Sequence, residues 1–136
     1  MPGACAAVAG LAGAGLPTDA FAFVGFLPKK SKARRQRLAA LASGTFTLIV
    51  YVAPHDLLDT LRDTAAVLGG ARRCCVAREL TKLHEEFWRG TLVDASDAFA
   101  HRQIRGEVWA VGRRPFCAIS ARRPARGTRR LTEPPP

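Results

Sequence analysis

The side chains best suited to bind an anion are crowded into one short stretch, where a helix is predicted to begin. They are Lys29, Lys30, Lys32, Arg34 and Arg35. A helix N-terminus carries partial positive charge, so cations there repel one another unless an anion binds. Unpaired backbone amides together with converging cations suit a phosphate group. The spacing therefore favours a phosphate-binding site, and the alternative interpretation is a solvated basic surface.

The cysteine and histidine positions do not favour a metal centre. Cys74 and Cys75 are adjacent, so they cannot readily pair with each other, and no CxxC spacing occurs. A zinc site would need ligands from distant parts of the chain, such as His55 and His84. Buried or idle thiols in a reducing compartment explain the cysteines better, and no metal site is predicted.

The elements around the cations are short and clearly bounded. Residues 21–27 are aromatic and β-branched enough for a strand, which Pro28 ends. Ser31 is the predicted N-cap of a basic helix that stops at Gly44. Upstream, the Ala-rich residues 2–14 predict a helix that packs closely through its glycines.

Strands and helices continue to alternate along the chain. Residues 46–52 form an unbroken apolar run, which is typical of a strand covered on both faces. A helix follows from Pro54 to the stop at Gly69 and Gly70, because its leucines recur with helical spacing. Further predicted elements are a strand at 74–77, extended residues 87–92, a weak helix at 94–103 and a strand at 106–111. This alternation predicts an α/β fold, a mixed sheet flanked by helices.

Two blocks of the sequence resemble one known family. Residues 15–35 carry G-L-P-T-D-x-F-x-F-x-G-F-L-P-x-K-x-K-x-R-R, and residues 77–91 carry A-R-E-L-T-K-x-x-E-E followed by R-G-T. Both blocks resemble the bacterial-type methyltransferases that modify the ribose 2′-oxygen of a cytidine in small-subunit ribosomal RNA. These enzymes belong to the tetrapyrrole-methylase-like superfamily. The resemblance covers about residues 2–112 and implies the C-terminal domain of such an enzyme.

The resemblance implies methyl transfer from S-adenosylmethionine to a ribose hydroxyl, without a metal. This displacement needs the oxygen in line with the sulfonium and a base that takes the hydroxyl proton. Glu79 is the preferred base, because it follows a predicted strand within the best-matched block. Glu85, Glu86, His84 and His55 are the alternatives. The sequence holds no GxGxxG loop or P-loop, so a dinucleotide-type cofactor site is not predicted.

The same resemblance implies which residues face the cofactor and the RNA. The predicted cofactor-facing residues are Cys5, Ala6, Tyr51, Glu79 and Leu80. The predicted RNA-binding residues are Lys29, Lys30, Lys32, Arg34 and Arg35. The hypothesis requires the basic helix and residues 78–82 to share one surface.

The chain departs from the family pattern in two respects. Where the family has Y-E-S-P-H-R, Val52, Ala53 and Asp56 replace a carboxylate, a hydroxyl and a guanidinium. The N-terminal domain motif G-T-P-x-I-S-D-P-G, which supplies much of the family's cofactor cleft, is not found here. We therefore expect this polypeptide alone neither to bind S-adenosylmethionine tightly nor to methylate RNA. A non-catalytic RNA-binding or assembly module is the alternative function.

Composition favours an anionic partner. The 136 residues carry a formal net charge of +10, and ribosomal RNA is the expected partner, with a homodimer left open. Residues 1–112 are predicted to form one domain, and the Arg- and Pro-rich residues 113–136 a disordered tail. The apolar residues 4–16 are too short to span a bilayer and lack a basic leader, so no membrane partner is expected. A bacterial-type ribosomal enzyme implies the cytoplasm, or a plastid or mitochondrion in a eukaryote.

Overall fold

The alternation of helices and strands predicted from the sequence is confirmed in a computed structural model, which describes residues 1–104, 108–113 and 116–119. The helices are α1 (Ala6–Ala14), α2 (Ser31–Leu41), η1 (Pro54–Asp56, a 3₁₀ turn), α3 (Leu57–Leu68) and α4 (Leu92–Ala100). The strands are β1 (Phe21–Phe26), β2 (Thr47–Val52), β3 (Arg73–Arg78), β4 (Glu86–Thr91), β5 (Val108–Arg113) and β6 (Phe116–Ile119).

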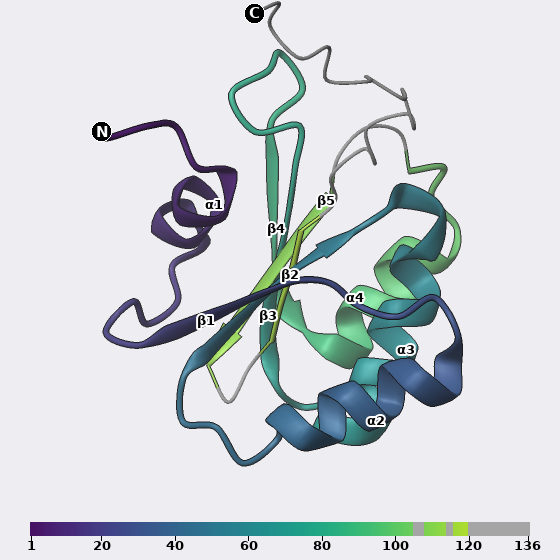
Figure 1. Cartoon of the computed structure of the whole chain (residues 1–136). Coiled ribbons are helices and arrows are strands. Elements are labelled where there is room, and N and C mark those ends of the chain that lie inside the picture. Colours follow the sequence, from purple (N-terminus) through teal and green to yellow (C-terminus); the bar gives the residue numbers. More distant parts are fainter. Residues whose placement is uncertain (105–107, 114–115, 120–136) are drawn as a thin grey trace, which may run out of the picture.

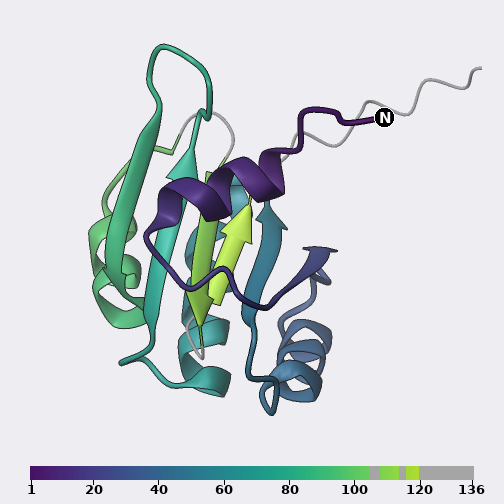
Figure 2. The ribbon, with the colours of Figure 1, turned by 90° about the vertical axis from the view of Figure 1, so that its left-hand side faces the viewer.

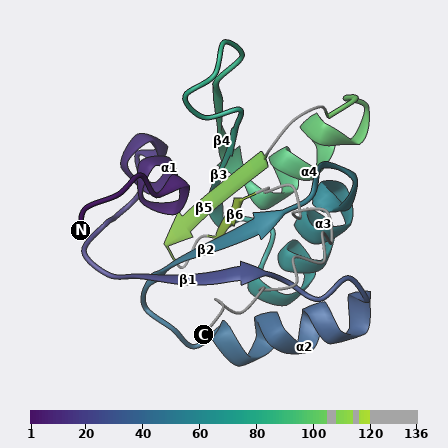
Figure 3. The same cartoon turned by 45° about the horizontal axis from the view of Figure 1, so that its top comes forward.

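The strands form one mixed sheet in the order β1-β2-β5-β6-β3-β4, with additional pairings of β2 with β6 and of β5 with β3. The pairs β1–β2, β2–β6 and β3–β6 are parallel, so β1, β2, β6 and β3 run in one direction. The carboxyl ends of β1, β2 and β3 therefore lie along the same edge of the sheet. The twist of the sheet fans these ends apart (Figures 1 and 3). Ligand sites of α/β sheets favour this edge.

One face of the sheet is covered by α2, α3 and α4 (Figure 1). Leu38, Leu61 and Phe99 from these helices pack against strand residues such as Val50 and Val76, and all five side chains are buried. This layer holds the larger of the two hydrophobic clusters. It explains the unbroken apolar run of β2, whose residues alternate between the two faces and are nearly all buried.

The opposite face carries α1, which lies across the sheet (Figure 2). Leu11 and neighbouring small residues of α1 pack on Ile49, Cys75 and Ala77. The close approach depends on Gly13, since a Cβ there would lie 2.4 Å from the ring of Phe87. Adjacent strand residues point to opposite faces, so Cys74 joins the cluster under α2–α4 and Cys75 joins the cluster under α1.

Several predicted boundaries are corrected. The predicted domain limit at residue 112 falls inside β5, and β6 extends the sheet to Ile119. Strand β6 was not predicted, because its four residues stand between basic and Pro-containing segments of the sequence. The rest of the predicted tail, residues 120–136, lies outside the described residues. None of the described helices is long and apolar enough to cross a membrane.

The predicted weak helix at 94–103 is shifted to Leu92–Ala100. Its N-cap is Thr91, whose hydroxyl accepts a hydrogen bond from the Asp94 amide. The Asp94 carboxylate accepts in return from the Thr91 amide at 3.1 Å, which completes a capping box. The Thr91–Asp94 spacing is present in the sequence, but Thr91 lies inside the segment predicted to be extended, so it was not recognised as an N-cap.

Candidate functional site

The basic stretch lies where β1 meets α2, at the carboxyl edge of the sheet. Lys30 is the N-cap residue of α2, and no described side chain caps the helix. The amides of the first turn therefore open toward the segment that carries Lys29 and Lys30. Lys29, Lys30 and Lys32 are all exposed. Three exposed cations thus lie at a helix N-terminus, which is an arrangement that suits a phosphate.

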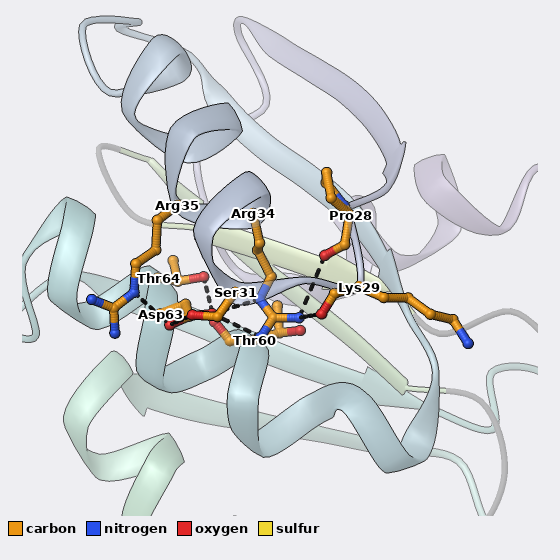
Figure 4. A network of polar contacts seen from close by, with 8 residues as sticks. All are labelled: Pro28, Lys29, Ser31, Arg34, Arg35, Thr60, Asp63 and Thr64. Atoms are coloured by element: carbon orange, nitrogen blue, oxygen red, sulfur yellow. Dashed lines mark hydrogen bonds and ion pairs between the residues drawn. The ribbon is translucent and has the colours of Figure 1, made fainter.

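The predicted N-cap role of Ser31 is wrong, because Ser31 is the first residue inside the helix. Its hydroxyl instead donates to Oδ1 of Asp63 on α3, at 2.9 Å. The same carboxylate accepts from Arg34 at 2.8 Å and from Arg35 at 2.7 Å (Figure 4). Asp63 therefore ties the first turns of α2 to the middle of α3.

Arg34 extends this network into the loop before the helix. Its Nη1 donates to the carbonyl of Lys29 at 3.1 Å and lies 3.5 Å from the carbonyl of Pro28 (Figure 4). Only 5% of the Arg34 side chain is exposed. Arg34 was expected to hold an RNA phosphate, but a buried guanidinium paired with Asp63 has no open side for one. Arg34 instead fixes the backbone that presents Lys29.

Arg35 occupies an intermediate position. Its Nε lies 2.7 Å from Asp63 Oδ1, yet 52% of its side chain is exposed. The outer nitrogens can therefore still meet an anion. Of the five predicted RNA-binding residues, Lys29, Lys30 and Lys32 are exposed, Arg35 is shared, and Arg34 is structural.

The ionisation of Asp63 reflects this network. Burial raises the pKa of its carboxyl, but the hydrogen bonds from Arg35, Ser31 and Arg34 outweigh burial and lower the pKa below 3.8. Asp63 is thus charged at neutral pH and compensates the two arginines. Asp63 was not among the predicted site residues; the available signal was an acidic residue set among the buried positions of a leucine-spaced helix.

A small pocket opens beside this loop, at the carboxyl ends of β1 and β2. Its lining includes Phe26, Pro28, Tyr51, Ala53 and Asp56. All three departures from the family pattern, at positions 52, 53 and 56, therefore line the pocket. Where the family places a carboxylate, a hydroxyl and a guanidinium, this chain has the side chains of valine, alanine and aspartate.

Residues 79–85, called the RELTK turn below after the motif of residues 78–82, connect the antiparallel strands β3 and β4. Glu79 and Thr81 adopt positive φ angles of 51° and 64°. Such angles are uncommon for residues other than glycine, above all for β-branched threonine. The amide of Thr81 donates to the Glu85 carboxylate at 2.6 Å, and the amide of Lys82 donates to the carbonyl of Glu79 at 3.0 Å. The turn is therefore held in a costly conformation by its own side chains.

The candidate bases differ in how they are engaged. Glu86 pairs with Arg78 at 3.3 Å and with Arg102 at 3.1 Å, and Glu85 is the acceptor that closes the turn. Glu79 lies 3.5 Å from the exposed ammonium of Lys82, with 19% of its own side chain exposed. His55 and His84 are exposed.

The predicted cofactor-facing residues are brought partly together. Tyr51 and Leu80 pack against the cluster under α1, on the same face of the sheet. Cys5 is the N-cap residue of α1, without a side-chain cap, and both Cys5 and Ala6 are exposed. Glu79 precedes Leu80 at the end of β3. Tyr51 and Leu80 thus share the α1 side of the sheet, while Cys5 and Ala6 stand at the exposed start of α1.

The basic loop and the RELTK turn share the carboxyl edge but lie at different ends of it. The turn projects beyond the sheet, whereas α2 begins on the side of β1 (Figures 1 and 3). Tyr51 and the pocket at the end of β2 lie between them in strand order. Within the described residues, no group of three or more His, Cys, Asp or Glu side chains could hold a metal ion.

Known proteins match this chain closely in sequence. It is 50% identical over 121 residues to "Ribosomal RNA small subunit methyltransferase I" of Synechocystis sp., and 49% identical over 119 residues to the protein of the same name from Halalkalibacterium halodurans. These matches cover 89% and 88% of the chain but only 40% and 38% of the relatives. The chain thus spans about two fifths of the length of these curated relatives.

Solved structures share the fold. The methyltransferase CobJ superposes with a TM-score of 0.60 and 24% identity, covering 82% of this chain and 48% of its own. The cobalt precorrin-4 methyltransferase CbiF superposes with a TM-score of 0.62 and 17% identity, covering 82% and 50%. The sequence profile of the tetrapyrrole (corrin/porphyrin) methylases matches residues 1–96. Because that match spans most of the chain and agrees with the superposed folds, the chain belongs to the tetrapyrrole methylase family.

Proposed function

We propose that this chain is the RNA-holding part of an S-adenosylmethionine-dependent methyltransferase that modifies a ribose 2′-oxygen in small-subunit ribosomal RNA. The observation that carries the proposal is the cluster of Lys29, Lys30 and Lys32 at the mouth of α2. Their loop is held by a buried arginine, so the cations are presented from a fixed backbone. The names of the half-identical relatives support ribosomal RNA as the substrate, in the compartment where ribosomes are assembled.

The cofactor would bind at the α1 side of the carboxyl edge. The uncapped first turn of α1, beginning at Cys5 and Ala6, offers backbone amides to a carboxylate, while Tyr51 and Leu80 offer an apolar wall. The residues present thus fit one side of the cofactor. The remaining three fifths of the relatives' length would supply the other side. S-adenosylmethionine would supply the methyl group and the sulfonium leaving group.

Glu79 would accept the proton of the ribose hydroxyl. The role is supported by the position of Glu79 directly after β3 and next to Leu80 in sequence, and by its positive-φ backbone within the turn that Glu85 closes. We expect the RNA to run along the carboxyl edge from the lysines toward this turn. The protein's main contribution would be to orient the hydroxyl toward the methyl carbon.

RNA binding by the full chain tests the first part of the proposal. In fluorescence anisotropy with a labelled small-subunit RNA fragment, Lys29→Ala/Lys30→Ala should weaken binding about tenfold at low salt. The slope of log K against log salt should fall by about 1.4, since each lost phosphate contact removes about 0.7. The matched control is Arg62→Ala/Arg73→Ala, which removes two exposed charges elsewhere and should change binding little. Equal losses of affinity in both double variants would mean that RNA binds through the overall positive charge of the protein and not at the lysine site.

Methyl transfer tests the second part. The chain would replace the corresponding segment of the Synechocystis relative, and transfer of a labelled methyl group to RNA would be measured. Glu79→Gln should lower the rate constant by about two orders of magnitude or more, because a general base typically contributes 10²–10⁴-fold. Asp97→Asn, which removes an exposed carboxylate on α4, is the control and should leave the rate constant unchanged. A fully active Glu79→Gln hybrid would remove Glu79 from the reaction.

The second candidate function is a non-catalytic RNA-binding or assembly module. It is favoured by the apolar and acidic replacements at Val52, Ala53 and Asp56, which remove polar groups from the pocket. It predicts lysine-dependent RNA binding without methylation, even in the hybrid.

A further inference from the structure

Three phenylalanine rings of β1 lie exposed on the face that carries α1. Phe21, Phe23 and Phe26 are 45%, 50% and 43% exposed. Large apolar side chains scattered singly on a surface are ordinary, but three aromatic rings along one edge strand form a continuous patch. The patch has no part in the hydrophobic cores, since Ala22 and Val24 are the β1 residues that pack on the helix-covered side.

A bulge in β1 brings Phe26 onto this face. Simple alternation would put Phe21, Phe23 and residue 25 on one side and Phe26 on the other. The pairing with β2 instead shifts between Phe23 and Gly25, and Gly25 adopts a φ of 73° that favours glycine. As a result Phe26 pairs in register with Tyr51.

Tyr51 joins the phenylalanines into one surface. Its ring centre lies 4.8 Å from that of Phe23 in an edge-on arrangement and 5.5 Å from that of Phe26. The rings therefore hold each other in place while a large part of each phenylalanine remains open to solvent. Helix α1 packs on β3, β4 and β5, at the other side of the same face.

Charge identifies the occupant of this patch. Immediately after Phe26 the chain turns into the loop of Lys29 and Lys30, so cations adjoin the aromatic rings at the carboxyl end of β1. Exposed aromatic rings next to lysines suit single-stranded nucleic acid, in which bases stack on the rings while phosphates meet the cations. A base-paired duplex would use the lysines but could not present unstacked bases to the rings.

We propose that Phe21, Phe23 and Phe26 form a stacking platform for unpaired bases of the RNA whose phosphates the lysines hold. This inference rests on the proposed RNA-binding function and adds that the bound segment is single-stranded. The platform lies on the edge strand, beside the pocket that Phe26 and Tyr51 line. Bases would enter along β1 toward the carboxyl edge.

The test compares single-stranded and duplex RNA of equal phosphate number, about ten nucleotides, in binding to the full chain. Phe23→Leu and Phe26→Leu each remove a ring but keep an apolar side chain. Each should weaken single-strand binding about fivefold or more, since a stacked base is worth about 1–3 kcal/mol, and should leave duplex binding unchanged. Phe23→Trp should retain or strengthen single-strand binding. Val93→Ala, an exposed apolar position on α4, is the control and should change neither.

The outcomes separate this inference from the proposed function. If the lysine variants lose RNA while both leucine variants bind single strands like the wild type, the platform is wrong and the phosphate site survives. If the wild-type chain binds no RNA, both proposals fail. If the leucine variants turn a dimer into a monomer in analytical ultracentrifugation and leave RNA affinity intact, the face belongs to a second copy and the platform is wrong. Unchanged circular dichroism and thermal unfolding confirm that the variants are folded.

Discussion

The two faces of the sheet are built on opposite principles. Under α2, α3 and α4 the side chains are large, branched and buried, and even the polar contact between α2 and α3 is made by a buried Asp63 with two arginines. On the other face α1 is made of small residues and covers part of the sheet, while β1 exposes three phenylalanines. One face stabilises the fold, and the other exposes aromatic rings along β1, next in sequence to the cations at the start of α2.

The difference shows where the chain accepts a cost in stability. Exposed aromatic rings lower the stability of the free protein, and so do cations at a helix N-terminus that no side chain caps. The rings lie along β1, and the cations follow directly after it in the chain. Such features are expected at binding sites, because a ligand removes the penalty that the free protein bears.

The largest expected effect lies in the covered face. Phe99→Ala should lower the free energy of unfolding by about 4 kcal/mol, because it removes a fully buried ring and leaves a cavity beside Trp88. Urea denaturation followed by circular dichroism measures this loss. A change below about 1 kcal/mol would contradict the assignment of this layer as the main core.

A slightly smaller effect is expected at the polar contact of that face. Asp63→Asn should destabilise the chain by about 3 kcal/mol, because it leaves the buried Arg34 without its counter-charge. It should also weaken RNA binding, since Arg34 holds the Lys29 loop. Asp59→Asn, an exposed acid on the same helix, is the matched control. Loss of stability with unaltered RNA affinity would show that the loop does not depend on this network.

The pH dependence of stability should expose the same contact. The folded-state pKa of Asp63 is lowered, so its contribution is complete above the ordinary value of 3.8 and is lost as the pH falls through the lowered folded-state pKa. The stability difference between wild type and Asp63→Asn should therefore be constant from pH 7 to about 5 and shrink in more acidic solution. Urea midpoints measured at each pH provide the comparison. A difference that grew with acidity would reverse the assigned direction.

The smallest expected effect lies on the open face. Phe21→Thr keeps the strand preference of the position but removes an exposed ring, and it should change the free energy of unfolding by less than about 0.5 kcal/mol. The contrast with Phe99→Ala is the measure of how differently the two faces are built. A loss comparable with that of Phe99→Ala would mean that the patch contributes to the core.

Local patterns in the sequence predicted the elements that depend on local chemistry. The leucine spacing of α3, the apolar run of β2 and the Pro28 boundary were sufficient to place these elements within a few residues. The mixed sheet with flanking helices followed from their alternation. Strand β6 escaped prediction because four residues carry too little periodicity, and its place in the sheet depends on partners distant in sequence.

The candidate site was predicted in residue type but not in role. Five cations were assigned to one site, yet two of them meet Asp63 from another helix, a contact between residues 28 and 29 positions apart. The conformation of the β3–β4 turn was not predicted, because the positive φ angles of Glu79 and Thr81 leave no mark in residue type. The bulge at Gly25 had a signal in the glycine itself, but its effect on Phe26 needed the register with β2.

The adjacent thiols of Cys74 and Cys75 on β3 are buried on opposite faces of the sheet, so their reactivities report on the two faces separately. Cys74 is sealed beneath the three-helix side and Cys75 beneath α1, and burial raises their pKa values to about 12 and about 11. Neither can react as a thiolate until its own cover lifts. Alkylation that begins at Cys75 would mean that α1 detaches from the sheet while α2, α3 and α4 stay in place. The order in which Cys74 and Cys75 are alkylated therefore reports which face of the sheet becomes exposed first.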